Sequence, residues 1–268
     1  MKHANLLAAL AALACTAAAP QPDWRRLDFA QTLVIDTTKG RIVVEMAPAF
    51  APLAVARVKQ LAREGVYDGL QFHRVIEGFV DQTGNPDNKD GGTSKYPDLP
   101  AEFSVRLQNS QTIVMRRGDG VEGFAGAVPF AGVSAAEQAL GKDHRLRVWG
   151  AYCAGAAGMG RQAGNDTANS EIFFMRDPAR RLDHDYAVWG AVVQGLDVVR
   201  AVKVGEPPAD PDRMLRVRVA ADLPADERPR IEVMNERGPA FRKRVADLRA
   251  NRGAAFSVCD VRLPSRKH

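Results

Sequence analysis

Short runs of β-branched and aromatic residues recur along most of this 268-residue chain, separated by Gly, Pro, Asn and Asp. Runs of this kind are typical of β-strands bounded by turns. We expect strands at residues 33–36, 41–46, 72–76, 101–107, 111–118, 147–152, 170–177 and 186–193. The first two flank a short turn that ends in Gly40, so they predict a β-hairpin. A chain with this many short strands is predicted to form an all-β sandwich or barrel.

Two segments show helical periodicity and would close the β structure. Pro52 suits the first turn of a helix, and Gly65 predicts where that helix ends. Between them, apolar residues follow on one face at helical spacing: Val55, Val58, Leu61 and Ala62. A shorter pattern at residues 195–205 predicts the second helix. The expected fold class is therefore mainly β with two helices.

The two ends of the chain differ in composition from its centre. Residues 1–19 combine a short basic start, an apolar run too short to span a bilayer, and small residues. They predict a signal peptide and an exported, periplasmic protein without a membrane span. A lipid anchor at Cys15 is the alternative, although the residues before Cys15 match a lipoprotein signal poorly. A polar linker is expected at 20–31, and an Arg-rich extension with one or two edge strands and a surface helix at 208–268.

The net charge and the cysteines say less about the function of the protein than the patterns above say about its fold. A net charge of +5 from 37 Lys and Arg against 32 Asp and Glu is typical of a solvated surface, so no nucleic-acid partner is expected. If Cys15 leaves with the signal peptide, Cys153 and Cys259 remain in an oxidising compartment, where a disulfide can form. Two isolated thiols are an equal alternative.

Motifs of conventional enzymes are missing from the sequence. The five histidines are scattered without metal-ligand spacing, and there is no P-loop, GxGxxG or GxSxG motif. We therefore expect no metal and no cofactor. The unusual residue is Arg74, a permanent charge inside the apolar run 72–76. On a strand it would share a face with Phe72 and Ile76, although a surface arginine is the common alternative.

The residues around Arg74 resemble those of a known family. Residues 67–86, YDGLQFHRVIEGFVDQTGNP, resemble the central motif of the cyclophilin-type peptidyl-prolyl cis-trans isomerases, and residues 158–175, GMGRQAGNDTANSEIFFM, resemble their second motif. The similarity spans residues 32–207, apart from an insertion at about 119–150. The resemblance implies a closed eight-stranded antiparallel β-barrel capped by two helices. It also implies a protein that acts on proline-containing polypeptides, which we expect to be a monomer.

The same resemblance implies functions for individual residues. Arg74, Phe79 and Gln82 would be catalytic, with Arg74 donating a hydrogen bond to the proline nitrogen as the peptide bond twists. The substrate-binding residues would be Val80, Gly160, Arg161, Glu171, Phe173, Leu182 and Tyr186. The expected activity is peptidyl-prolyl cis-trans isomerisation of folding or exported proteins.

Several of these positions depart from the usual family pattern. Val80 replaces a methionine, Gly160 replaces an alanine, and Tyr186 replaces a frequent histidine. Glu171 stands where glutamine is usual. We expect its carboxylate near Arg74, where it would compete with substrate for the guanidinium and lower the activity.

Two other functions are left open by the sequence. Thr83-Gly84 stands where Gly-Gly is usual after the glutamine, and this departure together with Glu171 favours a non-catalytic binding module or chaperone that grips proline-containing segments without isomerising them. Alternatively, the Arg-rich stretch 237–252 would bind a polyanion, either nucleic acid or a membrane surface. Because Arg74, Phe79 and Gln82 are all retained, an active isomerase is the preferred prediction.

Overall fold

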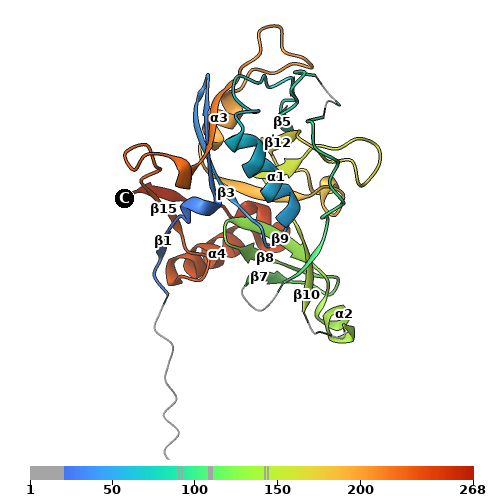
Figure 1. Cartoon of the computed structure of the whole chain (residues 1–268). Helices are drawn as coiled ribbons and strands as arrows, with labels where there is room; N and C mark the ends of the chain where they lie inside the picture. Colours follow the sequence, from blue (N-terminus) through green and yellow to red (C-terminus); the bar gives the residue numbers. More distant parts are fainter. Residues whose placement is uncertain (1–20, 90, 92, 108–110, 142, 144) are drawn as a thin grey trace, which may run out of the picture.

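The computed structural model describes residues 21–268 except 90, 92, 108–110, 142 and 144, and Figure 1 shows how its elements are arranged. The described residues form three antiparallel sheets with helices packed against them. The predicted signal peptide at 1–19, and with it Cys15, lies outside the described residues.

The largest sheet has eight antiparallel strands in the order β14–β2–β3–β13–β11–β12–β5–β4. Its strands are β2 Thr32–Thr37, β3 Gly40–Met46, β4 Arg74–Val75, β5 Val80–Thr83, β11 Ala156–Met159, β12 Ile172–Met175, β13 Val188–Gln194 and β14 Met214–Val219. Strands β2 and β3 form the predicted hairpin. The sheet curls, and backbone hydrogen bonds link the segment before β4 to β14, from Gly69 to Met214, and link β4 to the segment before β14, between Val75 and Gly205. The prediction of a mainly β fold with eight antiparallel strands is confirmed.

Two helices cover this sheet, as the sequence predicted. Helix α1, Pro52–Arg63, contacts β13 and β14, and helix α3, Leu196–Ala201, contacts β3. The apolar face of α1 is fully buried at Val58 and Leu61, in one core with Ile35 of the sheet. Burial of apolar surface contributes roughly 25 cal/mol per Å², so this helix–sheet contact stabilises the fold.

The insertion expected at about 119–150 is part of a second, five-stranded sheet in the order β6–β10–β9–β8–β7. Its strands are β6 Val105–Leu107, β7 Thr112–Arg116, β8 Val121–Ala125, β9 Val128–Gly132 and β10 Leu146–Gly150, with α2 Ala135–Leu140 between the last two in sequence. The strands at β6 and β7 lie upstream of the expected insertion, so the inserted unit is larger than the sequence indicated. The alternation of side chains indicates that a segment is a strand but not which strand it pairs with. The sequence therefore could not show that β6 and β7 belong to this second sheet.

The eight-stranded sheet also extends past the boundary expected at residue 207, because β14 pairs with β2 along Met214–Val219. After β14 the chain forms a three-stranded sheet in the order β1–β15–β16. Its strands are β1 Trp24–Arg26, β15 Ile231–Met234 and β16 Ser265–Lys267. The segment before the main sheet is therefore tied to the C-terminal tail, and the described part of the expected linker, residues 21–31, contains β1 and the short helix η1, Phe29–Gln31.

The rest of the tail packs against the second sheet. Helix α4, Pro239–Arg252, buries Phe241, whose ring meets the ring of Phe124 edge-on at 5.5 Å between centroids. A disulfide joins Cys153 to Cys259, which settles the alternative that the sequence left open. The second sheet, the tail and the outer face of the main sheet thus share one apolar core.

Candidate active site

Nine of the ten residues that the sequence assigned to a site line one cleft of about 290 Å³ at the β4–β5 end of the main sheet. They are Arg74, Phe79, Val80, Gln82, Gly160, Arg161, Phe173, Leu182 and Tyr186. The tenth, Glu171, is not among the lining residues.

Arg74 lies on β4 directly opposite Gln82 of β5, so the pairing of the two strands brings these side chains together. Nη1 of Arg74 donates to Oε1 of Gln82 at 3.1 Å, and Nε donates to Oε2 of Glu206 at 2.8 Å. The side chain of Arg74 is 30% exposed. Its Nη2 has no hydrogen-bond acceptor among the described residues, so this nitrogen is left to donate to a bound molecule.

The apolar wall of the cleft comes from separate elements. Phe79 is half-buried on the turn between β4 and β5, and Val80 begins β5. Phe173 of β12 lies opposite Gln82 in the sheet register, and Leu182 ends the short helix η2, Arg180–Leu182. Together these side chains form an apolar hollow beside the guanidinium of Arg74.

Aromatic contacts fix the deeper part of this wall. The ring of Phe173 stacks on the ring of Tyr152 at 5.7 Å and meets Tyr186 edge-on at 5.9 Å. Tyr152 is fully buried, and burial raises the pKa of its hydroxyl well above the usual range, so the group stays neutral. Phe173 is thereby held in one orientation. No signal in the sequence points to Tyr152 as part of the site, because the run 147–152 has the pattern of a strand but does not indicate which residues pack against it.

Two further guanidinium groups lie at the rim. The Cζ atom of Arg161 lies 4.5 Å from the ring centroid of Tyr186, and its Nε donates to the carbonyl of Asp185 at 3.1 Å. The Cζ atom of Arg181 lies 4.4 Å from the ring centroid of Phe79. Cations prefer this position over an aromatic face. Arg181 is not among the ten residues assigned to the site from the sequence, and it contacts the cleft only through Phe79, because it is not one of the lining residues.

Gly160 is required by close packing behind the cleft. A Cβ atom at this position would lie 2.7 Å from Cβ of Glu171, so alanine would force one of the two backbone segments to move. The backbone N–H of Gly160 donates to the carbonyl of Glu171 at 2.8 Å. The glycine therefore keeps the chain after β11 close to the residue before β12.

Glu171 corrects one expectation of the sequence analysis. Its carboxylate was expected near Arg74, but it is buried with Oε1 3.1 Å from Nε2 of His73 and accepts from the backbone N–H of Gly91 at 3.3 Å. His73 and Arg74 are neighbours in sequence, so their side chains project to opposite sides of the chain, and Glu171 faces the His73 side. The carboxylate that does contact Arg74 belongs to Glu206, which no local pattern in the sequence indicated.

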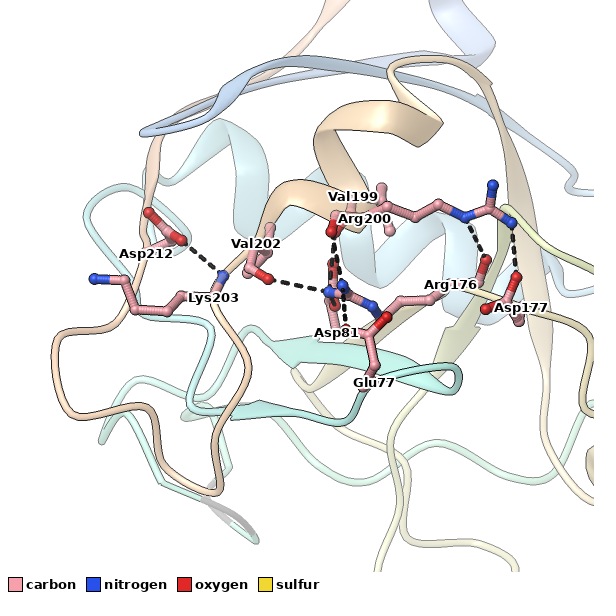
Figure 2. A network of polar contacts seen from close by, with 9 residues as sticks. All are labelled: Glu77, Asp81, Arg176, Asp177, Val199, Arg200, Val202, Lys203 and Asp212. Atoms are coloured by element: carbon pink, nitrogen blue, oxygen red, sulfur yellow. Dashed lines mark hydrogen bonds and ion pairs between the residues drawn. The ribbon is translucent and has the colours of Figure 1, made fainter.

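A buried ion pair anchors β5 from the face opposite the cleft, and Figure 2 shows it. Nη1 of Arg176 donates to Oδ1 of Asp81 at 2.9 Å, and both side chains are almost wholly buried. Arg176 also donates to the carbonyls of Arg200 and Val202, at 2.7 and 3.1 Å. The pair thus ties β5 to the end of α3, next to the positions of Val80 and Gln82.

Burial dominates the electrostatics of this pair. It raises the pKa of Asp81 to about 7, while the hydrogen bond and charge of Arg176 act in the opposite direction. An isolated buried carboxylate would be far less favourable. Arg176 therefore stabilises a strand that carries two residues of the cleft.

The described residues hold no group of three or more His, Cys, Asp or Glu side chains placed to bind a metal ion. Within the same residues, no helix is long and apolar enough to cross a membrane. What the cleft offers is an apolar hollow, a fixed cation and amide groups.

Comparison with known proteins gives consistent matches. The profile described as "Cyclophilin type peptidyl-prolyl cis-trans isomerase/CLD" matches residues 32–219. A probable peptidyl-prolyl cis-trans isomerase of Brucella suis is 32% identical over 223 residues, which cover 77% of this chain and 88% of the relative. Peptidyl-prolyl cis-trans isomerase B of Bacillus subtilis is 30% identical over 167 residues, 62% of this chain and 86% of the relative.

A solved structure is similar over more of the chain. The crystal structure of cyclophilin AquaCyp293 from Hirschia baltica superposes with a TM-score of 0.83 and 31% sequence identity. The superposition covers 91% of this chain and 92% of that chain. The similarity therefore extends beyond residues 32–219 into the parts of the chain that the family profile leaves out.

Proposed function

The chain belongs to the cyclophilin-type peptidyl-prolyl cis-trans isomerases, and we propose that the cleft around Arg74 is where it accelerates rotation about Xaa-Pro peptide bonds. The observation that carries this proposal is the position of Arg74. Its guanidinium lines the same cleft as Phe79, Phe173 and Leu182, so a cation and an apolar hollow are side by side.

The reaction requires no bond to be broken. Resonance opposes rotation about a peptide C–N bond with a barrier of about 18–20 kcal/mol, and uncatalysed Xaa-Pro bonds isomerise over roughly tens to hundreds of seconds. In the twisted state the lone pair of the proline nitrogen is no longer delocalised into the carbonyl. A donor directed at that lone pair stabilises the twisted state more than either planar state, which lowers the barrier.

Arg74 is suited to be this donor. Its guanidinium stays charged across the physiological pH range and presents its N–H groups in a rigid planar fork. Gln82 holds one edge of the fork, which leaves Nη2 available for the substrate. A donor placed in advance for the transition state is worth roughly 3–4 kcal/mol.

The other cleft residues position the substrate. The proline ring would occupy the hollow formed by Phe79, Val80, Phe173 and Leu182, with Tyr186 behind Phe173. The amide of Gln82 and the backbone at Gly160 and Arg161 would hold the peptide chain on either side of the proline. Glu171 has no part in substrate binding in this account, because its side chain is buried against His73.

Replacing Arg74 with alanine is expected to lower kcat/KM for a Xaa-Pro tetrapeptide by about 100- to 1000-fold, because the transition-state donor is lost. A protease-coupled assay measures the rate. The matched control is Arg63→Ala, which removes an exposed arginine of α1 that does not line the cleft. A wild-type protein with no rate above the uncatalysed background would contradict the proposal.

A binding module without catalysis is the second candidate, and two contacts favour it. Glu206 occupies Nε of Arg74, and Arg181 lies over the ring of Phe79, so the donor and one residue of the apolar wall already have partners before substrate binds. This candidate predicts that proline-containing peptides bind to the wild-type protein without faster isomerisation. The same assay, combined with a binding titration, separates the two functions.

We also propose that the protein is exported to the periplasm. Residues 1–19 have the composition of a signal peptide, and the Cys153–Cys259 disulfide is of a kind that persists in oxidising compartments, which supports the proposal. Cell fractionation tests it, with labelling of free thiols in each fraction. Recovery of the reduced, uncleaved chain in the cytoplasm would contradict export. The expectation of a monomer stays a prediction.

A further inference from the structure

A second cavity, of about 750 Å³, lies between α3 and the C-terminal tail. Its lining comes from residues 193–197, 200 and 201 of the main sheet and α3, and from residues 262–265 of the tail with Arg244 of α4. None of its lining residues lines the cleft around Arg74. The cavity is therefore a separate feature, built where the tail meets the main sheet.

Three arginines face this cavity: Arg200, Arg244 and Arg262. Burial and then the charges of Arg200 and Arg244 lower the pKa of Arg262, so Arg262 is close enough to each of the other two cations to be repelled by it. One carboxylate, that of Asp197, also lines the cavity and opposes this repulsion.

The arginines are only partly neutralised by the protein itself. Arg200 pairs with Asp177 at 2.7 Å and donates to the carbonyl of Arg176 at 3.1 Å, as Figure 2 shows. Nε of Arg244 donates to the carbonyl of Arg262 at 3.2 Å. Neither Arg244 nor Arg262 forms an ion pair with any carboxylate of the described residues. Two guanidinium groups at the cavity are thus available to an anion.

The floor of the cavity is apolar. Val193, Leu196 and Leu263 line it and are buried. A small inorganic anion would engage the arginines but leave this floor uncovered. A ligand that carries carboxylates and apolar side chains together would satisfy both parts, because guanidinium and carboxylate form paired, charge-assisted hydrogen bonds.

We propose that this cavity is a second peptide-binding site, which takes an acidic segment of a polypeptide with its carboxylates on Arg244 and Arg262 and its apolar side chains on Leu196 and Leu263. The ligand needs no proline. The site acts independently of isomerisation, so its failure would leave the activity of the Arg74 cleft untouched.

Fluorescence anisotropy with the full chain tests the proposal. The probe is a labelled, proline-free peptide of alternating Glu and Leu, and the matched peptide has Gln in place of every Glu. The double variant Arg244→Ala/Arg262→Ala is compared with Arg242→Ala/Lys243→Ala. The control variant removes the same charge from exposed positions of α4 that do not line the cavity. Isomerase activity towards a tetrapeptide is measured on every variant.

We expect the acidic peptide to bind the wild-type protein and the control variant alike, and the Arg244/Arg262 variant to bind about 100-fold more weakly, about tenfold per arginine. Binding should also weaken as salt is raised, while the Gln peptide does not bind. The salt series and the Gln peptide use the wild-type protein only. They therefore test whether binding depends on the carboxylates of the peptide even if the double variant does not fold.

Three results would overturn the proposal. The first is equal affinity for the Glu and Gln peptides. The second is equal weakening by the control variant, which would show a general effect of net charge. The third is displacement of the peptide by inorganic phosphate or by an oligonucleotide of equal charge at the same concentration, which would show a site for anions of any kind. Unchanged tetrapeptide isomerisation in the Arg244/Arg262 variant would support a site separate from the catalytic cleft.

Discussion

The guanidinium of Arg74 is held from two directions before any substrate arrives. Gln82 accepts from Nη1 and Glu206 accepts from Nε. The contact with Gln82 orients the fork, whereas the contact with Glu206 draws positive charge away from the position where the twisted amide would lie. At the residue scale, Glu206 is therefore expected to moderate catalysis.

Replacing Glu206 with glutamine is predicted to raise kcat/KM by about two- to fivefold, the range expected when an exposed ion pair of about 0.5–1 kcal/mol is removed. The Glu206 side chain is 52% exposed, so the fold should tolerate the change. The protease-coupled assay measures the effect.

The matched control is Glu171→Gln, which restores the residue usual in the family. Because Glu171 contacts His73 and not Arg74, this variant should not gain activity. A gain with Glu171→Gln but none with Glu206→Gln would show that the electrostatic partner of Arg74 has been misassigned.

Single residues also show what the sequence can and cannot predict about the site. The central motif is continuous, so it placed Arg74, Phe79 and Gln82 correctly relative to one another. Glu171 was misplaced because a sequence match gives a position in the chain but not the direction in which a side chain just outside a strand points. Glu206 was missed because it is 132 residues from Arg74 and lies in a loop without strand or helix periodicity.

At the scale of elements, β5 is fixed by contacts on both of its faces. Val80 and Gln82 face the cleft, and Asp81 faces Arg176. Arg176 also donates to carbonyls at the end of α3, so one side chain joins β5, β12 and α3. A change at this pair should therefore affect the fold first and the cleft through it.

Replacing Arg176 with methionine is predicted to destabilise the fold by about 3–5 kcal/mol, because Asp81 and the α3 carbonyls lose a buried partner. Chemical denaturation monitored by circular dichroism measures the loss. The double variant Asp81→Asn/Arg176→Met removes the carboxyl group that would lose its partner, so it should recover part of the loss. If the double variant is no more stable than Arg176→Met, the Asp81 carboxylate is not the source of the cost.

The pKa of Asp81 predicts a pH dependence of stability. The folded-state pKa is about 7, against an ordinary value of 3.8. Between these values the folded protein keeps a proton that the unfolded chain loses, so the contribution of Asp81 to stability falls as pH rises from about 4 to 7. The free energy of unfolding of wild type minus that of Asp81→Asn should fall over this range and then level off. A flat difference would show that the pKa of Asp81 is not raised.

The sequence predicts single helices and hairpins better than it predicts which sheet a strand joins. The β2–β3 hairpin and α1 were predicted within a few residues, because a hairpin and an amphipathic helix are specified by neighbouring residues. The runs at 101–107 and 111–118 were correctly expected to contain strands, but their place in a separate sheet was not. Sheet membership depends on pairing across tens of residues, such as β6 with β10, which no local pattern records.

At the scale of the whole molecule, the tail and the second sheet form one body with the main sheet. The Cys153–Cys259 disulfide closes a long loop, with a sequence separation of 106, and joins the tail to the segment between β10 and β11. The cavity with Arg244 and Arg262 exists only while the tail is held in place. The sequence indicated an extension but could not show that it completes a shared core.

Removing the disulfide with Cys153→Ser/Cys259→Ser is predicted to lower the free energy of unfolding by about 2–5 kcal/mol, because the unfolded chain regains the freedom of a long loop. Denaturation of the wild type with and without reductant, beside the double variant, measures this. Reductant should lower the stability of the wild type only. A reductant effect of equal size on the double variant would mean that the bond is not the cause.

The central claim is that Arg74 stabilises the twisted prolyl amide rather than simply binding the peptide. Exchange NMR spectroscopy on an enzyme-bound Xaa-Pro peptide measures the rate of cis–trans interconversion and the affinity together. For Arg74→Ala we predict an affinity close to that of the wild type and an interconversion rate lower by about 100-fold or more. Interconversion at the wild-type rate on Arg74→Ala would contradict the account.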